Sequence, residues 1–384
     1  MKLSKKIKKN LAALQYLKLR KKINENAFFF FFPFYHVGGA EQVHTDILEV
    51  FKNEKTLCFI TNTSKNEAFK ANFNKNSELL YMGNLIRNPF KKWVLKLISD
   101  AVNKKENPVV FGCNSAFFYD LVPYFAPHVK VIDLIHAFSE NGPEIWSLPV
   151  AERIDYRVVL GKKTATDFKN LYENQNKPKE LTNRLVIIPN KVEIPEILEP
   201  KSSQNTFQIL YVGRNSPEKR VSILFQIAEK CLQKNLPVVF NIIGDFSNYT
   251  NFIPKNVTLV GELNDKKHIN EYYKQSHLLL ITSYREGFPM VILEGMSYGV
   301  IPISTDVGEI SSLISEEKGT GWLIPNETNE AATADNFVNR IEYCINNPSV
   351  IQQFSENTFK CVKENFNFEN FAAAYKDLFS KQIK

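Results

Sequence analysis

The stretch that decides the fold is LLLITSYREGFPMVILEG, which spans residues 278–295. It opens with a short apolar run, residues 278–282, that has the length and composition of a buried strand. Pro289 suits the beginning of a helix, because its ring presets φ and its missing N–H is not needed there. We therefore expect Glu286 in a strand-to-helix loop and Glu294 within the helix. Strand, loop and helix in this order are the repeating unit of a parallel α/β sheet.

The same alternation of short apolar runs and helical segments extends from residue 27 onward. Several runs are apolar without a period of two, which is typical of strands covered on both faces. In the first half we predict strands at residues 27–34, 56–61, 108–111, 129–135, 156–160 and 185–188, and helices at 40–52, 91–103, 115–125 and 163–172. In the second half we predict strands at 207–212, 238–243, 257–260, 278–282 and 300–304, and helices at 217–233, 289–298, 336–346 and 368–383.

Residues 190–206 interrupt the alternation with two prolines and little periodicity, as a linker between domains does. The predicted fold class is therefore α/β, with two Rossmann-like domains whose parallel sheets face a central cleft. Ligands in such folds bind at the carboxyl ends of the strands, where helix N-termini point into the crevice. We divide the chain into an arm at 1–26, Rossmann-like domains at 27–195 and 196–366, and a closing amphipathic helix at 367–384.

The composition is that of a globular protein, with 44% hydrophobic and 23% charged residues among 384. Nine of its 48 Lys and Arg lie in residues 1–22, so the remaining 39 are set against 41 acidic residues, a net charge of −2. This balance argues against a nucleic-acid-binding body, which needs a basic face on the fold itself. The five cysteines never form a C-x-x-C pair. That favours free thiols in a reducing, cytoplasmic compartment over a zinc site or disulfides.

The basic arm has two interpretations. Ile7, Leu11 and Leu14 share one helical face and are flanked by lysines, as in a helix that lies on an anionic membrane surface. The same residues equally suit a solvated basic tail. The phenylalanine run at 28–32 is too short to span a bilayer, and no other stretch is long and apolar enough. In the first interpretation the protein is peripheral on the inner face of the cell membrane.

A second informative motif is YVGRNSPEKR, residues 211–220. Gly213 ends a strand, and Ser216 with the proline after it suits an N-cap and a first helical position. Arg214 and Lys219 would then flank a helix N-terminus, whose free amides favour an anion. Two cations there make a diphosphate site and would offset charge on a departing nucleoside diphosphate. The alternative is an ordinary solvated helix start.

Four further residues have a functional and a purely structural interpretation. Gly38 and Gly39 follow the first strand, where two glycines let the backbone approach a ligand closely, although a glycine pair also occurs in ordinary turns. His136 directly follows the strand predicted at 129–135, and its role is either structural or functional. Glu294 is the only charged residue between positions 287 and 305. A buried carboxylate needs hydroxyl or amide partners, such as a ribose, unless it caps a helix or reaches solvent.

Taken together, these stretches resemble glycosyltransferase family 4, a retaining family of the GT-B fold that belongs to glycosyl transferases group 1. Its diagnostic pattern of two glutamates eight positions apart stands here as EGFPMVILE, residues 286–294. The other signals follow in the family's order: GGAE at 38–41, the strand-end His136, IPN at 188–190, and Gly213, Arg214 and Lys219. The resemblance runs from about residue 28 to the C-terminus, and the ordered set favours the functional interpretation of each motif.

The resemblance implies a role for each residue. Glu286 and the amides of Gly287 and Phe288 would hold the transferred sugar. His136 would contact that sugar near the reacting centre, so Glu286 and His136 are the candidate catalytic residues. Glu294 would bind the donor ribose. The diphosphate would be held by backbone and side-chain groups of Gly38, Gly39, Gly213, Arg214 and Lys219.

The implied activity is that of a metal-independent hexosyltransferase. It would move a sugar with retention from a nucleoside diphosphate donor, UDP before GDP, to a glycan or lipid-linked glycan in cell-envelope polysaccharide synthesis. No cofactor and no metal ion are expected, and no Asp-x-Asp occurs in the chain. The first Rossmann-like domain would choose the acceptor and the second would bind the donor, while the final helix would cross back to the first.

Two departures and two alternatives accompany this interpretation. Arg220 and Lys191 stand where the family usually has glycine, which puts donor preference and loop shape in question. A GT-B sugar-nucleotide epimerase would share the fold but should not preserve the paired glutamates. A non-catalytic, membrane-surface sugar-binding protein would have no need of the acidic pair and the cations together.

Overall fold

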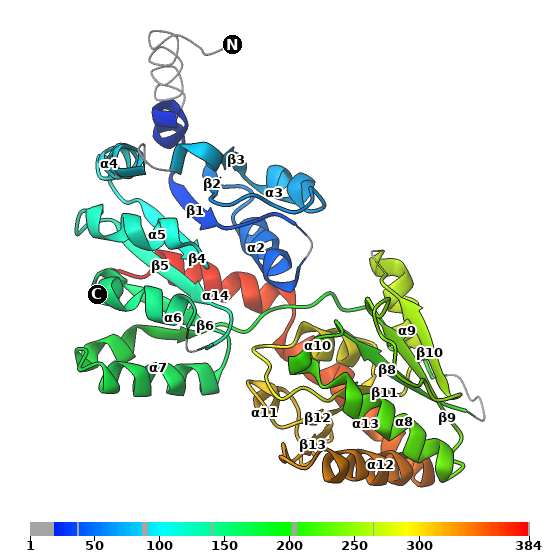
Figure 1. The fold of residues 1–384 in the computed structure, drawn as a ribbon. Coiled ribbons are helices and arrows are strands. Elements are labelled where there is room, and N and C mark those ends of the chain that lie inside the picture. The colour runs from blue at the N-terminus through cyan, green and yellow to red at the C-terminus, as the bar shows by residue number, and fades with distance from the viewer. Residues whose placement is uncertain are drawn as a thin grey trace. The chain divides into compact units, whose positions relative to one another are not determined.

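The computed structural model describes residues 19–36, 38–86, 91–139, 141–201, 206–263 and 265–382 (Figure 1). Two compact units divide the chain. The first contains the residues up to Leu160, Thr164–Pro189 and the residues from Ala372 onward, and the second contains Gly161–Lys163 and Asn190–Phe371. The chain therefore passes between the units at 189–190, near the expected linker, and the last helix has residues in both.

The first unit is built on a parallel sheet of seven strands in the order β3-β2-β1-β4-β5-β6-β7. Every strand pair in it is parallel, which confirms the predicted Rossmann-like architecture. The strands are β1 (Phe28–Phe32), β2 (Thr56–Ile60), β3 (Glu78–Tyr81), β4 (Val109–Cys113), β5 (Lys130–Ile135), β6 (Tyr156–Val159) and β7 (Leu185–Ile187). The helices are α2 (Gly39–Val50), α3 (Lys70–Asn76), α4 (Lys91–Val102), α5 (Ala116–Leu121), α6 (Pro143–Trp146) and α7 (Lys162–Asn174).

The phenylalanine run forms the central strand β1, which explains why it does not alternate. One side of the strand packs on the closing helix α14 (Phe368–Ser380), where the Phe30 and Phe379 rings stack with centroids 5.9 Å apart. On the other face, the Phe31 ring lies 5.7 Å from Phe118 of α5 and stacks at 4.6 Å on Phe59 of the adjacent strand β2. A strand covered on both faces has no solvent side on which to place polar residues.

The arm predicted at 1–26 ends in a helix that packs on the first unit. Residues 19–25 are helical, and Leu19 and Ile23 are buried in the core beside α4. Lys22 pairs with Glu78, with Nζ 2.7 Å from a carboxylate oxygen. The predicted membrane-surface face at Ile7, Leu11 and Leu14 lies outside the described residues.

The second unit is built on a parallel sheet of six strands in the order β10-β9-β8-β11-β12-β13. The strands are β8 (Phe207–Val212), β9 (Val238–Ile243), β10 (Val257–Gly261), β11 (Leu278–Ile281), β12 (Ile301–Thr305) and β13 (Trp322–Ile324). The helices are α8 (Val221–Gln233), α9 (Lys266–Gln275), α10 (Met290–Ser297), α11 (Ile310–Leu313), α12 (Glu330–Asn346) and α13 (Pro348–Asn365). This sheet confirms the second Rossmann-like domain. Within the described part of the chain, every helix is too short or too polar to cross a bilayer.

Candidate functional site

The predicted donor residues of the second unit lie at the carboxyl ends of two neighbouring strands. Gly213, Arg214 and Lys219 follow β8, and the loop 282–289 follows β11, which pairs directly with β8. Parallel strands end at the same edge of a sheet, so the two motifs meet although almost 70 residues separate them. Such an edge is where open α/β sheets bind their ligands.

The structure joins the two motifs through an ion pair between Lys219 and Glu286. The Lys219 Nζ donates to Glu286 Oε1 at 2.6 Å, and the Ser283 hydroxyl donates to the same oxygen at 2.5 Å. The Glu286 side chain is only 9% exposed and that of Lys219 20% exposed. Charge-assisted hydrogen bonds of this kind fix both side chains. A carboxylate and an ammonium group are therefore held side by side at the strand ends.

The helix predicted to begin at Pro217 does not form there. Pro217–Lys219 is a single 3₁₀ turn, Ser216 makes no capping hydrogen bond, and α8 begins only at Val221. Arg220 interrupts the helix because its φ is +45°, in the left-handed region. The expected role of Ser216 as an N-cap is therefore wrong, and Lys219 lies on a turn in front of the helix.

Arg220 is tied to the loop that carries Glu286. Its Nε donates to the Thr282 carbonyl at 2.8 Å, and one of its Nη groups donates to the Asn326 side chain at 2.7 Å. In return, the Thr282 hydroxyl donates to the Lys219 carbonyl at 2.8 Å. These bonds offset a backbone conformation that costs a residue other than glycine about 1–2 kcal/mol. They also fix the turn with Lys219 against the end of β11.

Arg214 is not brought into this ion pair. Its side chain is 81% exposed, and it lies 3.5 Å from the Glu218 carboxylate. An ion pair at that distance with a largely exposed arginine contributes at most about 1 kcal/mol. Of the two predicted cations, the structure places only Lys219 against Glu286.

Gly287 and Phe288 supply backbone donors next to Glu286. Among the described residues, the N–H groups of both lack a hydrogen-bond partner. They lie just before α10, where peptide dipoles favour an anion or a polar oxygen. Gly308 packs closely behind them: its φ is +59°, and a Cβ there would come within 2.1 Å of the Glu286 carbonyl oxygen. Only a glycine allows this approach.

Glu294 lies on α10 and has a phenolic partner. The buried Tyr273 hydroxyl donates to Glu294 Oε2 at 2.9 Å, so the carboxylate neither caps a helix nor stands alone. Burial raises the pKa of Glu294 from its ordinary value, and the Tyr273 hydrogen bond opposes that shift. The second carboxylate oxygen is not engaged by Tyr273, and it can accept from a ligand hydroxyl.

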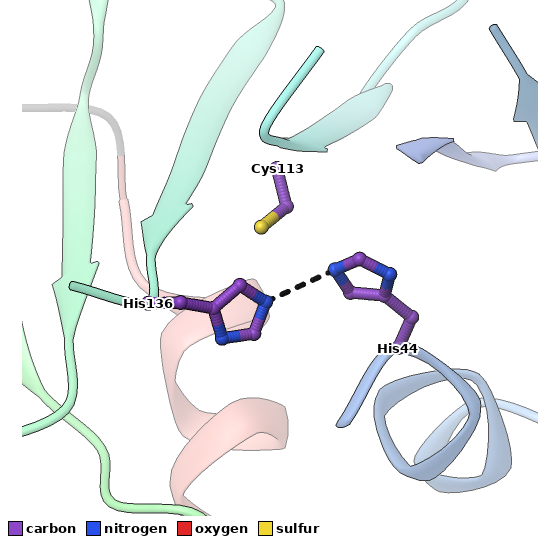
Figure 2. Close-up of side chains that lie close together, drawn as sticks. All are labelled: His44, Cys113 and His136. Carbon is purple, nitrogen blue, oxygen red and sulfur yellow. Dashed lines mark hydrogen bonds between the residues drawn. The ribbon is translucent and has the colours of Figure 1, made fainter. Parts of the chain in front are cut away.

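In the first unit His136 follows β5 and faces His44 of α2 (Figure 2). Their Nε2 atoms are 3.1 Å apart. Burial lowers the pKa of His136 to about 4 and the pKa of His44 well below its ordinary value. Both rings are therefore neutral at pH 7. His44 is also held flat against Phe32, with ring centroids 4.1 Å apart.

Sequence reasoning missed two residues beside His136, namely His44 and Cys113. Cys113 is the last residue of β4, which pairs with β5, so the ends of two predicted neighbouring strands could have suggested it. His44 could not be found in this way, because its place depends on how α2 packs on the sheet. In the sequence it is one polar residue in an amphipathic helix.

Gly38 and Gly39 lie at the N-terminus of α2. A Cβ on Gly38 would come within 2.2 Å of a Glu41 carboxylate oxygen, whereas nothing described lies within 4 Å of a Cβ on Gly39. Gly39 is exposed, so a ligand can reach the first amides of α2. This placement suits the predicted phosphate contact.

Comparisons with known proteins find similarity to glycosyltransferases. Residues 193–360 match the family model of glycosyl transferases group 1. An uncharacterised glycosyltransferase of Methanocaldococcus jannaschii is 30% identical over 183 residues, which are 46% of this chain and 48% of that protein. The UDP-Gal:alpha-D-GlcNAc-diphosphoundecaprenol alpha-1,3-galactosyltransferase of Escherichia coli is 27% identical over 222 residues, 52% of this chain and 55% of that protein. The chain thus spans about half the length of these relatives.

A solved structure covers almost the whole chain. HepE of Anabaena in complex with UDP aligns with a TM-score of 0.72 and 17% identity, over 92% of this chain and 99% of that one. At this identity the likeness concerns the fold. The chain therefore has the GT-B fold, and its residues 193–360 match glycosyl transferases group 1.

Proposed function

We propose that this chain is a retaining glycosyltransferase of family 4. It moves a hexose from a nucleoside diphosphate sugar, in the first place a UDP-sugar, to a glycan or a lipid-linked glycan acceptor. The observation that carries the proposal is the loop after β11, where Glu286, the amides of Gly287 and Phe288, and Lys219 come together. The group 1 match over this unit and the UDP-bound HepE support it.

In the proposed mechanism the loop after β11 holds the sugar and Lys219 serves the diphosphate. Glu286 accepts hydrogen bonds from sugar hydroxyls, while the amides of Gly287 and Phe288 donate to sugar oxygens. Lys219 offsets the negative charge that grows on the departing diphosphate. Arg214 can turn toward the same phosphates, since its side chain is 81% exposed and its described partner is the Glu218 carboxylate at 3.5 Å. Glu294 accepts from the donor ribose, and Gly213 allows the backbone approach.

The first unit supplies the acceptor side of the proposed reaction. Neutral His136 contacts the transferred sugar, and the α2 amides beside Gly38 and Gly39 contact the diphosphate. The acceptor oxygen attacks on the face that the leaving phosphate vacates, and that phosphate takes the acceptor proton. Such an attack retains the anomeric configuration without a covalent enzyme intermediate. Two cations and helix-end amides replace a donor-bridging metal ion in this scheme.

We further propose cell-envelope polysaccharide synthesis on the cytoplasmic side of the membrane as the setting. The name of the Escherichia coli relative specifies a UDP-sugar donor and a diphosphoundecaprenol-linked acceptor. The basic residues at 1–22 would hold such an enzyme near an anionic membrane.

A donor-and-acceptor assay tests the activity. Purified protein is incubated with UDP-glucose, UDP-galactose or UDP-N-acetylglucosamine, with and without lipid-linked acceptors, in the presence of EDTA. We expect one donor to yield nucleoside diphosphate and a product with a retained anomeric configuration. Interconversion of the donor sugars without an acceptor would instead establish the epimerase alternative. Binding of a donor that no acceptor turns over would favour a non-catalytic sugar-binding protein.

A further inference from the structure

Three side chains with nitrogen or sulfur donor atoms converge inside the first unit (Figure 2). His44 comes from α2, Cys113 is the last residue of β4 and His136 follows β5. Their donor atoms all lie within 4.8 Å of one another. We propose that this cluster binds one divalent transition-metal ion and that Zn²⁺ is the ion its donor set suits best.

The donor set and its geometry fit this ion. Imidazole nitrogen and thiolate sulfur are the usual ligands of Zn²⁺. In a tetrahedral site with bonds of about 2.0–2.3 Å, the ligand atoms lie roughly 3.3–3.6 Å apart. The two Nε2 atoms are already 3.1 Å apart. The donor atoms lie within 4.8 Å of one another, so the Cys113 sulfur has to approach the nitrogens by roughly 1.2 Å to reach the tetrahedral spacing.

The three ligands stand on a rigid frame. Cys113 and Leu134 are register partners in the β4–β5 pair, so the strand ends that carry Cys113 and His136 are fixed to each other. His44 is fully buried and stacked on Phe32. A site on packed elements holds its ligands more precisely than one on loops. Buried Cys58, on strand β2 of the same sheet, belongs to no such cluster in the described structure.

Metal binding is balanced by proton release. The Cys113 S–H bond breaks, its proton leaves to solvent, and the sulfur forms the metal bond without a change of oxidation state. One of the two rings carries the proton of the hydrogen bond between the Nε2 atoms. In that ring the proton moves to Nδ1, so that both Nε2 atoms are free to bind the ion. Nδ1 of His44 has no hydrogen-bond partner among the described residues, so this change of tautomer breaks no described bond there.

The site would keep one position open. Three protein ligands leave the fourth tetrahedral position for water or a ligand oxygen, as in zinc sites that are not purely structural. His136 is the partly exposed member of the three, whereas His44 and Cys113 are buried. Because we propose that His136 contacts the transferred sugar, the bound ion would compete with transfer. That consequence rests on the proposed function, whereas ion binding itself does not.

Co²⁺ titration of the chelator-treated full chain tests the site without donor or acceptor. Co²⁺ bound to a thiolate gives a charge-transfer absorption in the near ultraviolet, and tetrahedral Co²⁺ gives strong visible bands. We expect both with one equivalent of Co²⁺, and Zn²⁺ should abolish them because it binds such sites more tightly. Cys113→Ser should lose the charge-transfer band and bind Zn²⁺ more than about tenfold more weakly. The matched control is Cys58→Ser, a free and equally buried thiol of the same sheet, which should behave as the wild type.

Two results would overturn the proposal. One is a wild-type protein that shows no thiolate band at one equivalent of Co²⁺. The other is a band that persists in Cys113→Ser, which would assign it to another thiol. If Cys113→Ser does not fold, His44→Gln keeps all five thiols and should bind Zn²⁺ more than about tenfold more weakly. Unchanged affinity in that variant would exclude the cluster.

Discussion

Lys219 and Glu286 were both predicted as site residues, but their contact with each other was not. The spacing of the two glutamates and the strand-loop-helix pattern place Glu286 at a strand end. The contact depends on the order of strands in the sheet, which brings β8 beside β11. Neither motif predicts that order. For Arg214 the motif predicted more than the structure shows. The motif predicts two cations at the site, and packing places only Lys219 against Glu286.

His136 should make stability depend on pH. Burial lowers its pKa to about 4 in the folded protein, against about 6.5 in an unfolded chain. The unfolded state therefore binds the proton first, so this stability is complete above pH 6.5 and is lost as the pH falls toward 4. Between pH 7 and pH 5 the loss is about 2 kcal/mol for this group.

Urea unfolding of the wild type and His136→Asn in the presence of a chelator measures this effect. The variant should lose about 2 kcal/mol less of its free energy of unfolding between pH 7 and pH 5. His268→Asn, which changes an exposed histidine of the second unit, is the control and should follow the wild type. Equal losses in wild type and His136→Asn would show that the His136 ring is not kept neutral by burial.

Helices and strands could be predicted where the whole element is buried or strongly periodic. Strands β2 and β12, which are buried along their whole length, are such cases, whereas β3 was missed because its residues are partly buried or exposed. The predicted helix 217–233 was interrupted at Arg220, whose left-handed backbone gives no signal in a periodicity. The resembled family usually has glycine at this position, and that difference was the one sign in the sequence of a left-handed backbone conformation.

The Arg220 side chain should offset the strain of its own backbone. In Arg220→Gly the strain disappears together with the hydrogen bonds to Thr282 and Asn326, so the free energy of unfolding should change by less than about 1 kcal/mol. In Arg220→Ala the bonds disappear and the strain stays. We expect this variant to be about 1–2 kcal/mol less stable than Arg220→Gly in urea unfolding. Equal stability of the two variants would contradict a strained Arg220.

Gly308→Ala should displace the loop that carries Glu286. The new Cβ would meet the Glu286 carbonyl at 2.1 Å, and a displacement near 1 Å costs up to roughly 100-fold in kcat/KM for the donor. Gly261→Ala is the matched control, because its φ of +88° is also unfavourable for alanine but nothing described lies within 4 Å of its Cβ. Both variants should lose stability, and only Gly308→Ala should lose donor use in steady-state kinetics. Equal kinetics in the two would contradict the role of this close approach.

The fold class of the molecule was accessible from the sequence, because alternating buried strands and helices have few packing solutions. The two parallel sheets confirm it. The facing of the two sheets across a cleft stays a prediction, as do the acceptor and the sugar. The motifs predict only the residues that we propose bind a nucleoside diphosphate.

Membrane binding by the arm is tested with a deletion that spares the fold. Since Leu19 and Ile23 are buried, the deletion should stop at residue 18 and remove six lysines. Each lysine near an anionic surface contributes about 1 kcal/mol, so binding to phosphatidylglycerol vesicles should weaken by at least about tenfold in co-sedimentation. Neutral vesicles are the control. Unchanged binding would place the membrane contact elsewhere.

The central claim is a nucleoside diphosphate site built on Lys219 at the end of β8. Calorimetric titration with UDP, GDP, ADP and CMP in EDTA tests it on the wild type, Lys219→Ala and Lys230→Ala. Lys230 is the control because it pairs with Asp335 at 2.7 Å in the same unit. The account predicts that the wild type and Lys230→Ala bind one diphosphate, UDP first, and that Lys219→Ala binds it roughly 10–100-fold more weakly, the loss of one charge-assisted hydrogen bond. Equal affinity of all three proteins for UDP, or no nucleotide binding by the wild type, would contradict it.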